Sequence, residues 1–241
     1  MRTIARIDIK NHHVIKGINL EGLRKIGNPE NIIREYYLNG IDEIIIIDSV
    51  ASLYGRNNLF DLIQKITKDI FVPIVLGGGI RSLKDIENSL KSGADKVAIN
   101  SKALENPNFL SEAVSNFGES TIIVNIEAKK IGENRWEPYK FCGREKTNLN
   151  LIDWINVIQD RGCGEILLTS IDKEGTETGF DIDLITNVYE IIKKPLIISG
   201  GCGNLNHIQQ VKKKFKNLSV AIASVLHYKT LDICEIKKII L

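Results

Sequence analysis

The feature that most constrains the fold is a repeat that relates the two halves of the chain. Four segments of the first half return in the same order in the second: "RIDIKN" (6–11) as "NIEAKK" (125–130), "GIDEIII" (40–46) as "GCGEILL" (162–168), "PIVLGGGIRSL" (73–83) as "PLIISGGCGNL" (195–205), and "VAINS" (97–101) as "VAIAS" (220–224). The chain of 241 residues is long enough for one large core. The repeat therefore predicts one domain over 1–241, made of two half-barrels at about 1–119 and 120–241.

Short runs rich in Ile and Val alternate with segments of helical period. The sequence predicts strands at 3–9, 43–48, 73–77, 96–100, 121–127, 165–169, 195–199 and 219–223. Helices are expected near 30–39, 58–68, 83–92, 107–117, 149–161, 183–193, 205–215 and 229–240. Alternation of this kind implies parallel strands with right-handed crossovers. Eight such units favour an α/β fold of the (β/α)8 TIM-barrel type over an open doubly wound sheet.

Local signals refine this layout. Asn28-Pro29 and Asn106-Pro107 each predict a capping side chain before a proline at the first helical position, and "SLKD" from Ser82 predicts a capping box. Residues 128–147 predict a β-hairpin that turns at 132–134 and follows the fifth strand. His12 and His13 are expected in a mobile lid over the mouth of the barrel.

Composition excludes several classes of protein. With a formal charge of +2 and no long basic block, nucleic-acid binding is not expected. The four cysteines form no CxxC pair, so neither a disulfide framework nor a metal site is predicted, and no cofactor is expected. The N-terminus enters a strand without a signal peptide, and no apolar run reaches membrane-spanning length. The sequence thus predicts a cytoplasmic protein with no membrane partner.

Glycine-rich loops follow the third and seventh predicted strands. "GGGIRS" (77–82) with "INS" (99–101) forms one set, and "SGGCG" (199–203) with "AS" (223–224) forms its repeat. Glycines let backbone N–H groups face an anion, and barrels of this kind often hold phosphate after strands 7 and 8. Two such loops on opposite sides of the mouth predict a ligand with a phosphate at each end.

Two carboxylates end opposed strands between these loops. Asp8 closes the first strand and Glu127 the fifth, in matching places of the repeat. Carboxylates that face one ligand can serve as acid and base in proton transfer. We expect Asp8 and Glu127 to be the catalytic pair.

Charged side chains also ring the opposite, N-terminal end of the lumen. Counting by twos places Arg2 on the face of Asp8, Lys96 on the face of Asn100, and Glu165 on the face of Thr169. Glu43 matches Glu165 in the repeat. This ring is either a salt-bridged plug or a gate for a small molecule that passes along the axis.

At this point a family resemblance is clear. The stretches "IDIK…VIKG", "GIDEIIIID", "GGGIRS", "GADKVAINS", "GEILLTSIDKEGT", "SGG" and "ASVLH" resemble the cyclase subunit of imidazole glycerol phosphate synthase over nearly the whole chain. The resemblance implies a lyase of histidine biosynthesis that acts on a bis-phosphorylated ribulosyl aminoimidazole carboxamide intermediate. It also implies a glutaminase subunit docked at the N-terminal face, whose ammonia travels through the lumen.

The resemblance also implies roles for individual residues. The charged ring matches the ammonia gate of the family, formed here by Arg2, Glu43, Lys96 and Glu165. Asp8 matches the first catalytic acid, and Glu127 stands at the second. Substrate and phosphate contacts are expected from Lys16, Gly79, Asn100, Ser101, Thr169, Glu174, Gly175, Gly201, Ala223 and Ser224.

Several departures from the family cluster at the mouth. Glu127 and Glu174 replace aspartates, and Arg6 and Asn125 replace small residues. This pattern resembles cyclase-like paralogues that deliver ammonia for converting an acetamido sugar of a surface or flagellin glycan into an acetamidino one. A non-catalytic barrel that activates a glutaminase and conducts ammonia is a further alternative, and the charged ring speaks against a sister isomerase. Arg6 is predicted to contact Glu127, to keep it ionised, and so to weaken cyclase activity.

Overall fold

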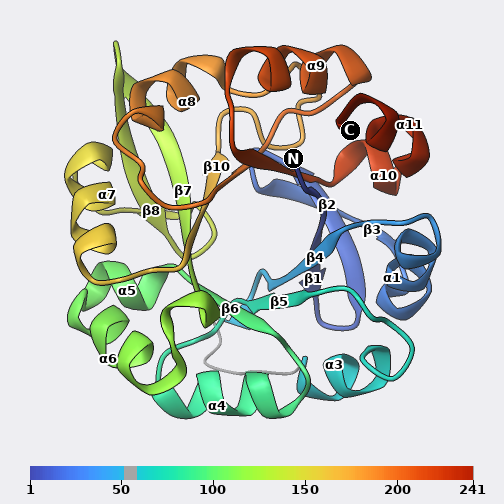
Figure 1. The fold of residues 1–241 in the computed structure, drawn as a ribbon, viewed down its shortest axis with the longest axis horizontal. Helices are drawn as coiled ribbons and strands as arrows, with labels where there is room; N and C mark the ends of the chain where they lie inside the picture. The colour runs from blue at the N-terminus through green and yellow to red at the C-terminus, as the bar shows by residue number, and fades with distance from the viewer. Residues whose placement is uncertain (52–58, 241) are drawn as a thin grey trace.

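The barrel closes through one continuous ring of parallel strands. The computed structural model describes residues 1–51 and 59–240. Within them, eight parallel strands pair in the order β10-β11-β12-β1-β4-β5-β6-β7, and β10 pairs back onto β7 (Figure 1). These strands are β1 (Thr3–Lys10), β4 (Glu43–Asp48), β5 (Ile74–Gly77), β6 (Lys96–Ile99), β7 (Ile122–Gly132), β10 (Glu165–Ser170), β11 (Leu196–Ser199) and β12 (Leu218–Ile222). The predicted (β/α)8 TIM-barrel class is confirmed.

Helices surround the strands as an outer layer (Figure 1). They are α1 (Pro29–Leu38), α3 (Phe60–Ile66), α4 (Leu83–Lys91), α5 (Ser101–Glu105), α6 (Asn108–Phe117), the 3-10 turn η1 (Glu119–Thr121), α7 (Leu151–Asp160), α8 (Ile182–Tyr189), α9 (Leu205–Lys214), α10 (Ser224–His227) and α11 (Ile233–Ile240). In the described part of the chain no helix is long and apolar enough to span a membrane.

Alternation along each strand divides the buried residues between two cores. The outward set packs against the helices and includes Ile7, Ile46 and Ile166. The inward set fills the lumen and consists of Ile4, Ile45, Ile47, Val75, Ala98, Ile123, Leu167, Ile197 and Ala221. Polar residues at the ends of these inward-facing positions, such as Asp8 on the same face of β1 as Ile4, therefore point into the lumen.

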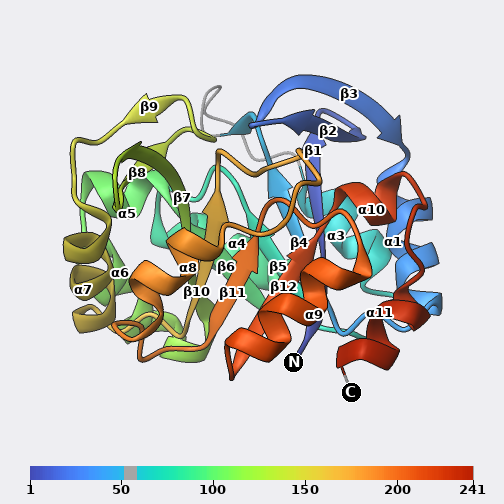
Figure 2. The same ribbon diagram turned by 90° about the horizontal axis from the view of Figure 1, so that it is seen from above.

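Two hairpins stand over one end of the barrel. β2 (His13–Ile18) and β3 (Glu21–Gly27) form the first, while β8 (Arg135–Lys140) extends β7 in the second and β9 (Glu145–Lys146) pairs with β8. Figure 2 shows β2, β3 and β9 at the end opposite to the chain's N-terminus. This end is the mouth, because the parallel strands finish there.

Most predicted elements are found, and the differences have local causes. The hairpin at 128–147 is confirmed, as are the cap of Asn28 and the capping box of Ser82. The expected cap of Asn106 is wrong, because α6 begins after Pro107 without a side-chain cap. The lid expected around His13 is a paired strand whose hairpin turns at Asn19 and Leu20, both with positive φ. The first residue of the predicted helix 58–68 lies outside the described residues, and α3 covers Phe60–Ile66.

Gly78 offers a test of how tightly strand ends pack beneath the mouth. Its φ is +89°, and an added Cβ would lie 2.7 Å from the backbone nitrogen of Asp48 and nearer still to its carbonyl oxygen. Gly40 has a φ of +83° but open space around it. Both alanine variants carry the left-handed strain of about 1–2 kcal/mol, and only Gly78→Ala adds a clash. Urea unfolding should show a larger loss of stability for Gly78→Ala, and equal losses would contradict this packing.

Candidate active site

The four charged residues predicted at the floor of the lumen do form one ring. Arg2 Nη1 lies 2.7 Å from Glu43 Oε2, and Lys96 Nζ lies 3.1 Å from Glu43 Oε1. Both cations also pair with Glu165. Burial opposes the charge of Glu165, but hydrogen bonds from Arg2 and Lys96 outweigh it and lower the pKa of the carboxyl. The ring closes the N-terminal end of the barrel with balanced charge.

Arg6 and Asp8 form the layer nearest the mouth on β1. The Arg6 side chain is buried, with Nε 3.2 Å from Asp8 Oδ1. Its Nη1 donates to Thr169 Oγ1 at 2.7 Å and to Ser199 Oγ at 3.4 Å. Burial disfavours the charged guanidinium, yet Asp8 and Glu127 outweigh this effect and the pKa of Arg6 is raised. The guanidinium thus crosses the lumen from β1 to β10 and β11.

Glu127 faces the same space from β7 but has other partners. Its Oε2 accepts hydrogen bonds from Asn100 Nδ2 at 3.1 Å and from the backbone N–H of Gly143 at 2.9 Å. Burial raises the pKa of Glu127 to about 7, and the opposing effect of Arg6 is smaller. At neutral pH this carboxyl therefore exists in both its protonated and ionised forms.

The predicted Arg6–Glu127 contact is wrong. Among the described residues Arg6 forms its ion pair with Asp8, two residues along the same strand. The two side chains leave the same face of β1, so the guanidinium reaches Asp8 without crossing the lumen. Glu127 is consequently not held ionised by a direct pair, and desolvation dominates its titration.

Lys16 on β2 reaches the mouth from above. Its ammonium pairs with Glu174, which lies in the loop after β10, and both side chains are buried. Burial lowers the pKa of Lys16 to about 8. The backbone supports the pairing, because Asn19 N donates to Glu174 O at 2.7 Å and a Cβ on Gly175 would lie 3.0 Å from the Gly17 carbonyl carbon. These two predicted contacts are therefore brought together, by an ion pair that the sequence did not reveal.

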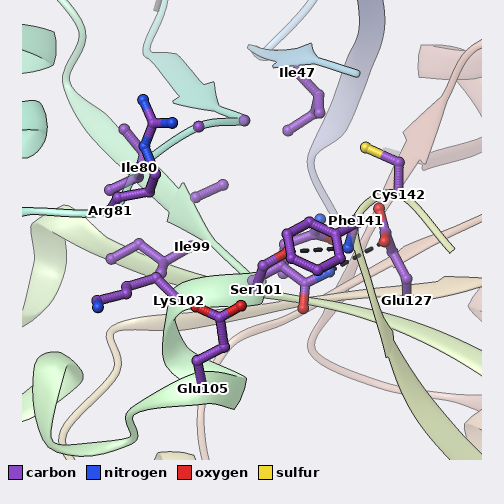
Figure 3. Close-up of a pocket in the computed structure, with 15 residues that line it drawn as sticks. Ile47, Ile80, Arg81, Ile99, Ser101, Lys102, Glu105, Glu127, Phe141 and Cys142 are labelled. Atoms are coloured by element: carbon purple, nitrogen blue, oxygen red, sulfur yellow. Dashed lines mark hydrogen bonds between the residues drawn. The ribbon is translucent and has the colours of Figure 1, made fainter. Parts of the chain in front are cut away.

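The first predicted phosphate loop lines a pocket beside Glu127. Figure 3 shows this pocket between Arg81, Ser101 and Lys102 on one side and Glu127 with Cys142 on the other. Gly79 and Asn100 also line it, as do Gly78 and Asn125. The amide oxygens of Asn100 and Asn125 are buried and have no hydrogen-bond partner in the described structure.

The second predicted loop is more tightly covered. Gly201 has a φ of +95°, and its carbonyl accepts from Gly179 N at 2.7 Å. Ala223 and Ser224 are buried where β12 gives way to α10. Thr169 lies in this half as well, but its hydroxyl serves Arg6. The segment after β10 therefore lies across this loop.

Sequence reasoning missed the segment between β8 and β9, which crosses the mouth. Phe141 N donates to Ser101 Oγ at 3.0 Å, and Tyr139 O accepts from Asn100 Nδ2 at 3.1 Å. Phe141, Cys142 and Gly143 all have positive φ, at 51°, 55° and 75°. Figure 3 shows the Phe141 ring beside Ser101 and Glu127. The Gly143 in "FCG" was a possible signal for such a turn, but nothing local indicates what the turn touches.

The mouth defines a class of protein. It combines two buried carboxyl groups of different environment, an ammonium, and glycine-rich loops at the carboxyl ends of parallel barrel strands. Within the described residues no group of three or more His, Cys, Asp or Glu side chains is placed to hold a metal ion. Fold and site together define a (β/α)8 barrel with acidic and basic side chains gathered at the carboxyl ends of its strands, where barrel enzymes place their active sites.

Comparison with known proteins identifies the family. The chain matches the family described as "Histidine biosynthesis protein" over residues 2–232, and it belongs to that family. It is 48% identical over 205 residues to "Imidazole glycerol phosphate synthase subunit HisF" of Legionella pneumophila, which covers 85% of this chain and 97% of the relative. Proteins of the same name from Bacillus cereus (strain AH187) and Streptococcus mutans serotype c are 40% and 38% identical over 237 residues, 98% of this chain and 94% of each relative.

The raised pKa of Glu127 predicts a pH-dependent penalty on stability. Between its ordinary value of 4.5 and about 7, the folded protein keeps a proton that the unfolded chain has released. The free energy of unfolding should therefore fall by roughly 3 kcal/mol as pH rises through this window. Glu127→Gln should lack this decline. Urea unfolding at a series of pH values measures the difference, which should grow up to about pH 7 and then level off; parallel curves for the two proteins would refute the assignment.

Proposed function

We propose that this chain is the ammonia-using cyclase subunit of an imidazole glycerol phosphate synthase, a lyase of histidine biosynthesis. The observation that carries the proposal is the unequal pair of carboxyl groups in the mouth. Asp8 is ion-paired to Arg6, whereas Glu127 has a pKa of about 7 and can hold or release a proton at neutral pH. The names and extensive identity of the relatives support the same activity.

In this proposal each part of the mouth has a role toward a bis-phosphorylated ribulosyl aminoimidazole carboxamide. Asp8 accepts protons and Glu127 donates them. Backbone and hydroxyl groups near Ser101 and Ser224 bind the two terminal phosphates, and Lys16 with Glu174 contacts the substrate between them. We further propose that residues 1–241 form one domain of two half-barrels, and that the protein works in the cytoplasm.

Ammonia is the proposed nitrogen source, supplied by a glutaminase subunit on the N-terminal face. The floor ring of Arg2, Glu43, Lys96 and Glu165 stands where such ammonia would enter the lumen. At the other end, the unpartnered amide oxygens of Asn100 and Asn125 beside Glu127 suit a ligand with N–H donors. Hydrogen-bond acceptors at the mouth and a charge-balanced ring at the N-terminal end both fit ammonia that travels along the barrel axis.

A second candidate is a cyclase-like paralogue that channels glutaminase-derived ammonia for the conversion of an acetamido sugar into an acetamidino one. The observation that favours it is Arg6, whose buried guanidinium fills the lumen directly beneath Asp8. Both readings route ammonia through the barrel. They differ in the acceptor of the ammonia, which is the ribulosyl intermediate in the first and an acetamido sugar in the second.

Turnover with a defined substrate tests the function. Purified protein supplied with the ribulosyl intermediate and an ammonium salt should form imidazole glycerol phosphate. Asp8→Asn should lower kcat by about 10²- to 10⁴-fold, the contribution typical of a general acid or base. A wild-type protein that makes no product from this intermediate, yet supports amidination of an acetamido sugar, would favour the second candidate.

The proposed ammonia route through the floor ring is tested by measuring how tightly glutamine hydrolysis is coupled to product formation. With a glutaminase subunit bound, Lys96→Ala removes the ammonium that bridges Glu43 and Glu165. Glutamine hydrolysis should continue, while product formed per glutamine falls and activity with ammonium salt persists. Lys84→Ala is the control, because Lys84 is exposed on α4 and, among the described residues, forms an ion pair only with Glu87 of its own helix. Unchanged coupling in Lys96→Ala would remove the ring from the ammonia route.

A further inference from the structure

The Arg6 guanidinium uses two of its three nitrogens for hydrogen bonds to the described residues. Nε donates to Asp8 and Nη1 donates to Thr169 and Ser199, whereas Nη2 has no hydrogen-bond partner among the described residues. Nε and Nη2 form one edge of the rigid planar fork, so an N–H of Nη2 runs parallel to the bond that Asp8 accepts. Arg6 is only 1% exposed and lines the pocket that contains Asp8, Lys16 and Glu127.

We propose that Arg6 is a further catalytic residue, which donates from Nη2 to the carbonyl oxygen that ammonia attacks. An oxygen beside Asp8 is the acceptor that Nη2 fits, because its N–H runs parallel to the bond that Asp8 accepts. The inference rests on the proposed function, since it concerns the addition of ammonia to a carbonyl.

Other cations around the pocket are less suited to this role. The ammonium of Lys16 is engaged by Glu174, and burial lowers its pKa to about 8. Arg144 lines the same pocket but is an exposed residue of the segment above it. Among these cations Arg6 alone is buried below the carboxyl groups. Its Nε and Nη1 bond three partners, which hold Nη2 in place, so this donor is preorganised.

The addition step balances with the groups present. The nitrogen of ammonia forms a bond to the carbonyl carbon, and the C=O π electrons move to oxygen, whose negative charge is stabilised by Arg6. Asp8 takes a proton from the new ammonium nitrogen, and protonated Glu127 gives one to the oxygen. Asp8 then returns its proton to the hydroxyl, which leaves as water, while nitrogen forms the C=N bond and releases a proton to Glu127. Carbonyl and ammonia thus give imine and water, and both carboxyl groups regain their starting states.

Kinetics with an ammonium salt as nitrogen source test the proposal. Arg6→Gln keeps a side chain of similar reach in the lumen but removes the cationic fork. We expect kcat to fall by about 10²- to 10³-fold, as when one oxyanion donor is removed, with little change in KM for the phosphorylated substrate. In Arg6→Ala, millimolar guanidinium should restore part of the rate. It should not raise the rate of Asp8→Ala or of the wild type.

The pH–rate profile separates direct catalysis from an effect through Asp8. If Arg6 only positioned Asp8, Arg6→Gln would move the acidic limb of the profile and leave the plateau rate intact. The proposal instead requires a lower plateau. A plateau in Arg6→Gln within about tenfold of wild type would overturn the inference and leave the proposed function standing. Failure of wild-type protein to turn over the ribulosyl intermediate would overturn the proposed function first, and the inference with it.

Discussion

The pairing of β10 with β7 is the constraint on which the rest of the structure depends. It closes the sheet, and a closed sheet sends every second side chain of eight strands into one lumen. A charge that is buried there needs a partner inside the lumen, because burial without one is costly. The floor ring and the Arg6–Asp8 pair are two solutions to this demand, one at each end of an apolar middle layer. Closure thus determines where polar chemistry can occur in this chain.

The two carboxyl groups of the mouth differ because the lumen is not symmetric. Asp8 shares its strand with Arg6, and a spacing of two residues puts both groups on one face within ion-pairing distance. The equivalent position below Glu127 holds Asn125, a neutral amide. Desolvation therefore prevails at Glu127, although Arg6 acts on it from across the lumen and two N–H groups donate to it. Similar positions in the repeat thus acquire different surroundings from a single change of neighbour.

The sequence predicted what depends on period and order. Strand positions, the inward rows and the floor ring follow from alternation, which the closed barrel enforces. The wrong Arg6–Glu127 contact shows the limit of prediction from alternation. Alternation predicted that both side chains enter the lumen, but it did not predict which carboxylate would pair with the long, flexible side chain of Arg6. The Lys16–Glu174 pair and the contact of Phe141 with Ser101 escaped for a related reason. The first joins β2 to the loop after β10, and the second joins the segment after β8 to the start of α5. These segments are far apart in the chain, and their meeting depends on tertiary packing that local patterns do not encode.

The hairpins over the mouth bear on how a ligand would enter. A Cβ on Gly143 would lie 2.8 Å from Leu20 Cδ1, so the segment after β8 touches the turn of the β2–β3 hairpin directly above Asp8 and Glu127. The Phe141 N–H of this segment already bonds Ser101, and the carbonyl of Tyr139 in β8 already bonds Asn100; the proposed phosphate site needs both Ser101 and Asn100. A bound phosphate would accept from the Asn100 amide N–H in competition with the carbonyl of Tyr139, which now uses that donor. Such an exchange of hydrogen-bond partners limits the net free energy of binding.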